Sequence, residues 1–133
     1  MVKGQKMTFE TKEYRNRQIE AVSGRMSEDA ALVLEFIRRK TGKDNCSYSG
    51  DELPATTMEE IVESTLLNET RIRWELHSLV ITGFVIKNSM GRFNMYSISD
   101  DGSDAAEFLM DEQRYPGRKM KFRAILDAKK EGR

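Results

Sequence analysis

The order of predicted elements between Thr57 and Gly102 constrains the fold more than any other feature of this chain. The pattern predicts a short helix, a tight turn, a second helix, two short strands joined by a turn, and the start of a third helix. Thr57 and Glu60 form a capping box that begins the first helix. Asn68 is a good N-cap for the second helix, and Gly83 is a C-cap that ends it. This order is that of a helix-turn-helix followed by a β-hairpin wing.

The second helix, expected from about Glu69 to Thr82, has an apolar stripe that faces inward: Ile72, Leu76 and Leu79. A period of 3.6 then places Thr70, Trp74, His77 and Ile81 on the opposite face, with Arg71 and Arg73 to either side. In such a unit the second helix can lie in a DNA major groove, and the hairpin can reach the backbone. The candidate DNA-binding residues are therefore Asn68, Thr70, Arg71, Arg73, Trp74 and His77 in the helix, and Lys87 and Arg92 in the wing.

The flanking segments predict additional helices. Residues 1–25 form a basic N-terminal arm or a helix from about Phe9 to Ser23, and Ser27 is the N-cap of a helix that ends before Gly42. Residues 41–56 are expected to form a loop with a short strand near residues 55–56. Another helix starts after Ser99 and is stopped by Pro116 and Gly117. We therefore expect a mainly α fold with a small β-hairpin wing (α+β), a winged-helix domain over residues 26–113, and a basic helix or tail over 114–133.

The tail carries apolar residues at helical spacing among lysines and arginines: Phe122, Ile125 and Leu126. This stripe predicts a dimer interface, with the charged side left for DNA or solvent. An arm that follows DNA phosphates is the alternative use of the same segment.

Charge is distributed unevenly although the net charge is zero. Counting Lys and Arg against Asp and Glu, residues 1–25 carry +3, residues 26–113 carry −9 and residues 114–133 carry +6. If the partner is nucleic acid, the two ends are expected to supply much of the attraction to phosphate.

Several function classes find no support in the residues. No apolar run approaches the roughly 18–20 residues that span a bilayer, so no membrane association is expected. The single cysteine, Cys46, cannot form an internal disulfide, which favours a cytoplasmic location. His77 has no metal-ligating neighbours at suitable spacing, and no phosphate-binding glycine loop or acid–base pair is present. We therefore expect neither an enzyme nor a bound metal or cofactor.

The helix-turn-helix and wing resemble winged-helix transcription regulators of the MarR and ArsR type. The resemblance lies in residues 58–62, residues 67–76, the Gly83–Phe84–Val85 segment, the wing around Gly91–Arg92, and residues 96–102. It implies a DNA-binding homodimer that pairs through its terminal helices. The sequence departs from these families because Glu69 and Glu75 balance the two arginines of the second helix. The cysteine motif of metal-sensing ArsR members is also missing, so metal sensing is not expected.

Each candidate residue also has an ordinary structural interpretation. The second helix can be a solvated face on which Glu69 pairs with Arg73, and the wing cations can be an ordinary hairpin tip. An exposed indole is costly, so Trp74 is expected to pack inside the chain or against a subunit rather than on DNA. The predicted function is sequence-specific binding of double-stranded DNA by a homodimer, as a transcriptional regulator or as a plasmid or viral accessory. The alternative is a protein-interaction module that binds a partner through the Trp74 face.

Overall fold

The computed structural model describes residues 9–42 and 55–132. Its elements follow one another as α1 (Phe9–Ser23), α2 (Glu28–Thr41), β1 (Thr56–Thr57), α3 (Met58–Thr65), α4 (Glu69–Thr82), β2 (Val85–Met90), β3 (Phe93–Ile98), α5 (Asp100–Leu109) and α6 (Arg118–Gly132). The loop expected over residues 41–56 lies mostly outside the described residues, and Cys46 lies outside them. No helix in the described ranges is long and apolar enough to cross a membrane.

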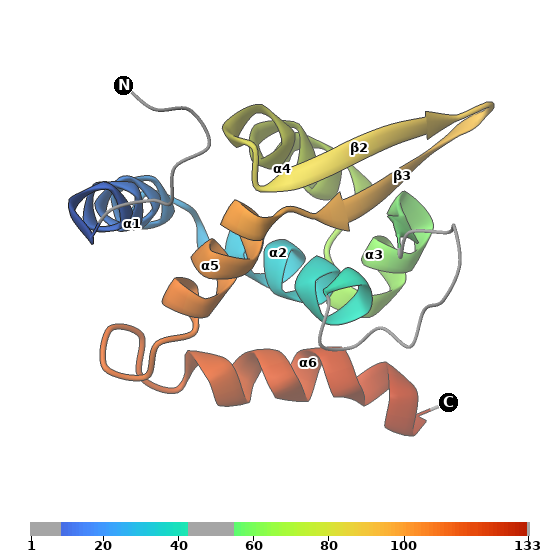
Figure 1. Ribbon diagram of the computed structural model, residues 1–133. Coiled ribbons are helices and arrows are strands. Elements are labelled where there is room, and N and C mark those ends of the chain that lie inside the picture. The colour runs from blue at the N-terminus through green and yellow to red at the C-terminus, as the bar shows by residue number, and fades with distance from the viewer. Residues whose placement is uncertain (1–8, 43–54, 133) are drawn as a thin grey trace.

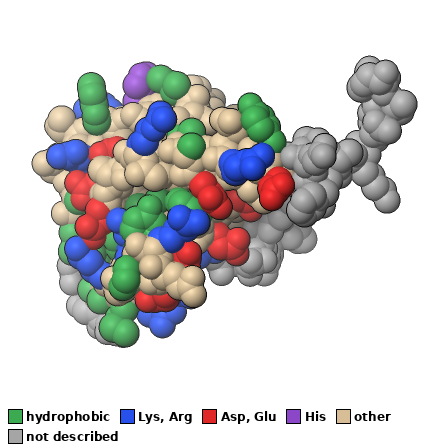
Figure 2. Space-filling view, turned by 90° about the vertical axis from the view of Figure 1, so that its left-hand side faces the viewer, with side chains coloured by type: hydrophobic (Ala, Val, Ile, Leu, Met, Phe, Trp, Pro, Cys, Tyr) green, Lys and Arg blue, Asp and Glu red, His purple; other side chains and the backbone are tan. Residues whose placement is uncertain are grey.

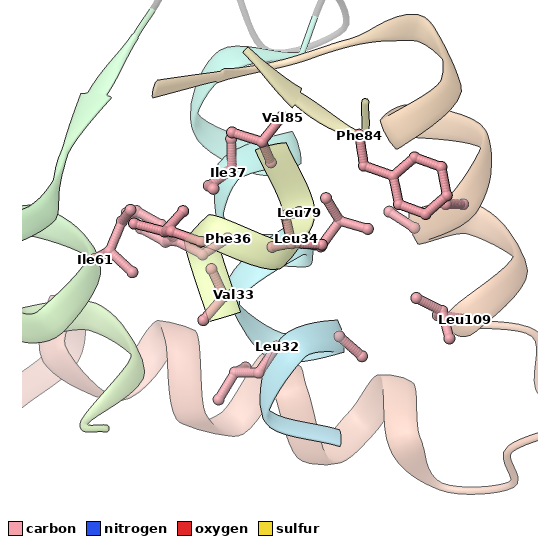
Figure 3. Packing of buried hydrophobic residues seen from close by; sticks show 14 of the residues in the cluster. Leu32, Val33, Leu34, Phe36, Ile37, Ile61, Leu79, Phe84, Val85 and Leu109 are labelled. Atoms are coloured by element: carbon pink, nitrogen blue, oxygen red, sulfur yellow. The ribbon is translucent and has the colours of Figure 1, made fainter. Parts of the chain in front are cut away.

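Helix α2 is the centre of the molecule (Figure 1). Every residue from Ala30 to Ile37 is buried, and the helix contacts α3, α4, α5, β1 and β3. Figure 3 shows its apolar side chains among those of the surrounding elements, including Ile61, Leu79 and Leu109. A helix covered on all sides buries charged groups only if they are paired. Glu35 is accordingly held by Arg38, whose Nη2 lies 2.7 Å from Glu35 Oε2.

The helix-turn-helix consists of α3 and α4, as the capping residues predict. The Thr57 side chain accepts from the Glu60 backbone, and the Glu60 side chain accepts in return, so the capping box is formed. Leu66 ends α3 with φ of +64°, in the left-handed region that redirects the chain into α4. Asn68 Oδ1 then accepts from Arg71 N at 2.8 Å and begins α4. Gly83 ends α4 with φ of +88°.

The sheet has three antiparallel strands in the order β1-β3-β2. In the hairpin, Val85 pairs with Ile98, Lys87 with Tyr96, and Met90 with Phe93. Val85 and Tyr96 are buried, so this face of the sheet lies on the core. The two-residue strand β1 pairs with β3, which confirms the expected short strand near residues 55–56. The hairpin tip extends away from the helices (Figure 1).

Helix α5 ends earlier than the sequence indicates. We expected Pro116 and Gly117 to stop it, but it ends at Leu109. The Asp111 carboxylate accepts from the Gln113 backbone at 3.2 Å, and such a local side-chain bond competes with helical hydrogen bonding. Residues 110–117 therefore form an irregular connection between α5 and α6.

The terminal helices belong to the same hydrophobic core as the winged helix. Ile19 of α1 and Phe122 and Leu126 of α6 are members of that core. Arg15 of α1 forms ion pairs with Asp101 and Asp104 of α5, at 2.9 Å from the latter. The first and last predicted segments thus share one core with residues 26–113. The structure confirms the predicted class, mainly α with a small β-hairpin wing.

Candidate nucleic-acid interface

Helix α4 presents the face that its periodicity predicts. Ile72, Leu76 and Leu79 are each at most 2% exposed, so they anchor the helix in the core. On the opposite side the exposed residues are Thr70, Trp74, His77 and Ile81. Asn68 lies at the start of this face, with its side-chain oxygen used as the cap. The outer face of α4 is therefore free of contacts with the described core.

The two arginines of α4 are held by carboxylates of the same chain. Arg71 Nη1 lies 3.3 Å from Glu75 Oε2, and its Nε lies 3.5 Å from Asp29 Oδ2. Arg73 pairs with Glu69 one turn earlier, the pairing that the ordinary interpretation predicts. Both arginine side chains remain half exposed or more. Neither is fixed in a position that reaches outward from the helix.

Trp74 does not pack inside the part of the chain that the structure describes. Its side chain is 71% exposed and that of Ile81 is 70% exposed. For Trp74, packing inside this part of the chain is therefore wrong, whereas packing against a subunit stays a prediction. The reason is geometric, because the inward positions of α4 are already filled by the stripe at 72, 76 and 79. Trp74 and Ile81 instead add an apolar component to the outer face.

The hairpin carries the two cations expected at the wing. Lys87 lies on β2, and Arg92 lies in the turn beside Gly91, whose φ is +66°. Both side chains are exposed, and neither forms an ion pair with a residue that the structure describes. Unlike the arginines of α4, these cations are available to an external anion.

An absence of acidic residues marks the same surface. No Asp or Glu occurs from residue 76 to residue 99, although the chain has 22 of them. This stretch covers the second half of α4 and the whole hairpin, and it contains His77, Lys87 and Arg92. Figure 2 shows the single histidine at the upper rim of the molecule beside hydrophobic side chains, with acidic side chains lower on that face. The net charge of −9 over residues 26–113 does not reveal this acid-free segment, because all the carboxylates of that range lie outside residues 76–99.

Neighbouring surfaces are more acidic. Glu59 and Glu63 are exposed on α3, the helix that precedes α4. A cleft of about 840 Å³ among α1, α2 and α5 is lined by six carboxylates and two cations. Phosphate groups are repelled by such surfaces. The acid-free surface formed by the second half of α4 and the hairpin is therefore the better place for a polyanion. The described residues contain no group of three or more His, Cys, Asp or Glu that could hold a metal ion.

The three residues predicted to form a dimer interface lie within the chain instead. Phe122 is completely buried, Leu126 is 9% exposed, and Ile125 packs partly against the same core. Helix α6 contacts α3, and Arg39 of α2 pairs with Asp127 of α6 at 3.1 Å. The amphipathic stripe of α6 is thus satisfied by the chain's own core. A dimer that preserves this fold cannot pair through Phe122 or Leu126, whereas a contact through the partly buried Ile125 stays a prediction.

These features define a winged helix-turn-helix with flanking helices at both ends. The sequence matches no protein-family model and no curated relative. Two solved structures share the fold. One is TubR of type III plasmid segregation, with a TM-score of 0.50, 16% identity, and coverage of 76% of this chain and 86% of TubR. The other is a TubR mutant, also with a TM-score of 0.50, with 15% identity and coverage of 74% and 93%. These likenesses establish the fold, and the resemblance to the MarR and ArsR type stays a prediction.

Proposed function

We propose that this protein binds double-stranded DNA through the outer face of α4 and the β2–β3 hairpin. The observation that carries the proposal is the acid-free segment of residues 76–99, on which Lys87 and Arg92 are exposed and form no ion pair with a residue that the structure describes. Attraction between cations and phosphates supplies most of the affinity for DNA of any sequence. Within this arrangement α4 enters the major groove and the hairpin contacts the adjacent backbone or minor groove.

Sequence readout in this proposal comes from the first half of α4. Exposed ion pairs contribute only about 0–1 kcal/mol, so DNA can displace Glu69 from Arg73 and free its guanidinium. Arginine then bonds guanine with two parallel hydrogen bonds, and Thr70 or Asn68 contacts a base edge or a phosphate. His77 lies one turn further along the same face.

We further propose that the protein acts as a homodimeric DNA-binding accessory of a plasmid or virus. The fold shared with a plasmid segregation protein favours this role over transcriptional regulation. A two-fold dimer would bring two copies of α4 to successive major grooves and so raise both affinity and sequence selectivity.

Salt-dependent DNA binding tests the proposal. We would measure binding of a fluorescent random duplex by anisotropy between about 50 and 200 mM salt, for the wild type and for Lys87→Ala/Arg92→Ala. Each lost phosphate contact lowers the slope of log affinity against log salt by about one, so the double variant should lose about two. The matched control is Arg17→Ala/Arg25→Ala, which removes two exposed cations outside α4 and the hairpin.

Two results would refute this assignment. The first is a wild type that does not bind duplex DNA at low salt. The second is an equal loss of slope in the wing variant and the control, which would mean that overall charge rather than the hairpin attracts DNA.

A second candidate function has one specific observation in its favour. Trp74 and Ile81 form an exposed apolar pair on α4, and tryptophan is enriched at the centres of protein interfaces. On this interpretation α4 binds another protein, and the arginines are of little importance. Trp74→Ala would then abolish capture of that protein while Arg71→Ala and Arg92→Ala leave it intact. If Arg71→Ala and Arg92→Ala instead weaken DNA binding more than Trp74→Ala does, the first candidate function is favoured.

A further inference from the structure

Phe93 occupies an unusual place for a large apolar side chain. It is the first residue of β3, directly after the Gly91–Arg92 turn, and it is 59% exposed. Side chains of paired residues in an antiparallel hairpin share a face. The pairing of Ile86 with Ser97 and of Met90 with Phe93 therefore places Phe93 on the face opposite the buried Val85 and Tyr96. The residues that the structure describes leave more than half of it uncovered.

The surroundings of Phe93 are uncharged or basic. Arg92 precedes it and Asn94 follows it, and both Asn88 and Ser89 are exposed on the partner strand. Ser89 Oγ lies 3.1 Å from Asn94 Oδ1, so a hydrogen bond joins the two strands near the tip. The tip projects well beyond the helices (Figure 1). An exposed aromatic ring is thus held at the end of a hydrogen-bonded, acid-free extension, beside a guanidinium that forms no ion pair with the described residues.

We infer that Phe93 is an apolar wedge that enters the minor groove and unstacks a base step, so that the protein kinks the DNA it binds. This inference rests on the proposed function and adds a mode of binding to it. Proteins that bind the minor groove combine Arg or Asn with an inserted Phe, Leu, Ile or Met, and they kink the duplex by roughly 20–90°. Arg92 and Phe93 supply this combination in two consecutive residues.

Charge and shape favour DNA over other occupants of the hairpin. Arg92 suits the negative potential of a narrow minor groove, and no carboxylate in the hairpin opposes it. The same face also carries Asn88, Ser97 and the partly buried Met95, with Ile86 47% exposed nearer the body of the protein. Because Phe93 lies at the end of the hairpin beside Arg92, its ring can reach a base step before the rest of that face does.

The test measures bending separately from binding. A duplex of roughly 20 base pairs that contains flexible TA steps carries a donor and an acceptor dye at its two ends. Saturation with wild-type protein should raise energy transfer, because a kink shortens the distance between the ends. A 2-aminopurine placed at a TA step should brighten at the same time, because it loses stacking. Anisotropy on the same duplex reports binding.

Three variants make the test specific. Phe93→Ala should bind within about tenfold of the wild type and leave energy transfer at the value of free DNA. Phe93→Leu preserves an apolar wedge and should retain at least part of the increase. Tyr14→Ala removes an aromatic side chain of similar exposure, 60%, on α1, and should behave as the wild type does. Circular dichroism of each variant checks that the fold is preserved.

The possible failures are distinguishable. If the wild type binds no duplex, the proposed function itself is refuted. If it binds without any rise in energy transfer, or if Phe93→Ala bends DNA as much as the wild type, DNA binding stands and the wedge is refuted. Loss of self-association by Phe93→Ala in analytical ultracentrifugation, with bending unchanged, would assign the ring to contact with a second copy instead.

Discussion

The side of α4 on which each residue lies could be predicted from the sequence, whereas the ion-pair partners of Arg71 could not. The inward and outward positions of α4 follow from its period of 3.6 and are confirmed residue by residue, from Ile72 at 0% exposure to Trp74 at 71%. The partners of Arg71 were not predictable in the same way. Asp29 lies 42 positions earlier in the sequence, and only the packing of α2 against α4 brings the two side chains together.

Gly102 offers a test at the residue scale. It lies in the first turn of α5, where a Cβ atom would approach the Phe84 carbonyl oxygen to 2.0 Å and Ile98 Cδ1 to 2.9 Å. Alanine is a better helix former by about 1 kcal/mol, but overpacking against backbone costs more. We therefore expect Gly102→Ala to lower the free energy of unfolding by about 3 kcal/mol in urea denaturation.

The adjacent residue provides the control for this prediction. Ser103→Ala makes a similar change one position along the same helix and should alter the free energy of unfolding by less than about 0.5 kcal/mol. A Gly102→Ala protein that is as stable as the wild type would mean that α5 does not pack this closely against the start of β2.

At the scale of elements, local hydrogen bonding explains why most helix starts were predictable. Ser27, Thr57, Asn68 and Ser99 all serve as N-caps in the structure. A cap depends on a few neighbouring residues, so the sequence alone specifies it. The end of α5 and the direction of the α6 stripe were not predictable. The end of α5 depends on the competing hydrogen bond of Asp111. The surface that the α6 stripe contacts depends on how the other elements have packed.

The capping box of α3 gives a pH prediction. The Thr56 hydroxyl donates to Glu60 at 2.6 Å, and together with the Lys40 ammonium it lowers the pKa of Glu60 below its ordinary value. A lowered pKa in the folded state adds stability above the pKa of the unfolded chain, and this stability is lost as pH falls through the folded pKa. Glu60→Gln should therefore destabilise the protein at pH 7 and much less below about pH 4.

Urea denaturation at pH 7 and about pH 3 measures this difference. Glu59→Gln is the matched control, because Glu59 is exposed on the same turn of α3 and is not the capping residue. The magnitude at pH 7 is expected to be at most about 1 kcal/mol, the usual contribution of a cap. A difference between wild type and Glu60→Gln that is the same at both pH values would contradict the role assigned to the carboxylate.

At the scale of the whole molecule, α6 is part of the fold and not an appendage. Phe122 is fully buried, and Lys121 Nζ lies 2.6 Å from Glu28 Oε2 at the start of α2. The apolar stripe at 122, 125 and 126 was correctly recognised in the sequence. The surface that this stripe packs against could not be predicted, because an amphipathic helix can cover its own core or a partner with the same residues.

Removal of the Phe122 ring distinguishes packing on the chain's own core from packing on a partner. Truncating a fully buried Phe typically costs about 3–5 kcal/mol, so Phe122→Ala should greatly lower the urea midpoint. Met120→Ala on the same helix removes a side chain that is 75% exposed and should leave the midpoint unchanged. If Phe122→Ala instead unfolds at the wild-type midpoint and only reduces the mass measured by light scattering, then Phe122 pairs two chains.

The burial of α2 on all sides also affects how the chain is made. This helix is synthesised before α3, α4, β3, α5 and the core residues of α6, which all come later in the chain. About 80 further residues separate the end of α2 from Phe122, and at about 5–20 residues per second a ribosome needs roughly 4–16 s to add them. During that interval the apolar side chains from Ala30 to Ile37 lack their native cover. Nascent chains of this protein should therefore be bound by chaperones until α6 has emerged.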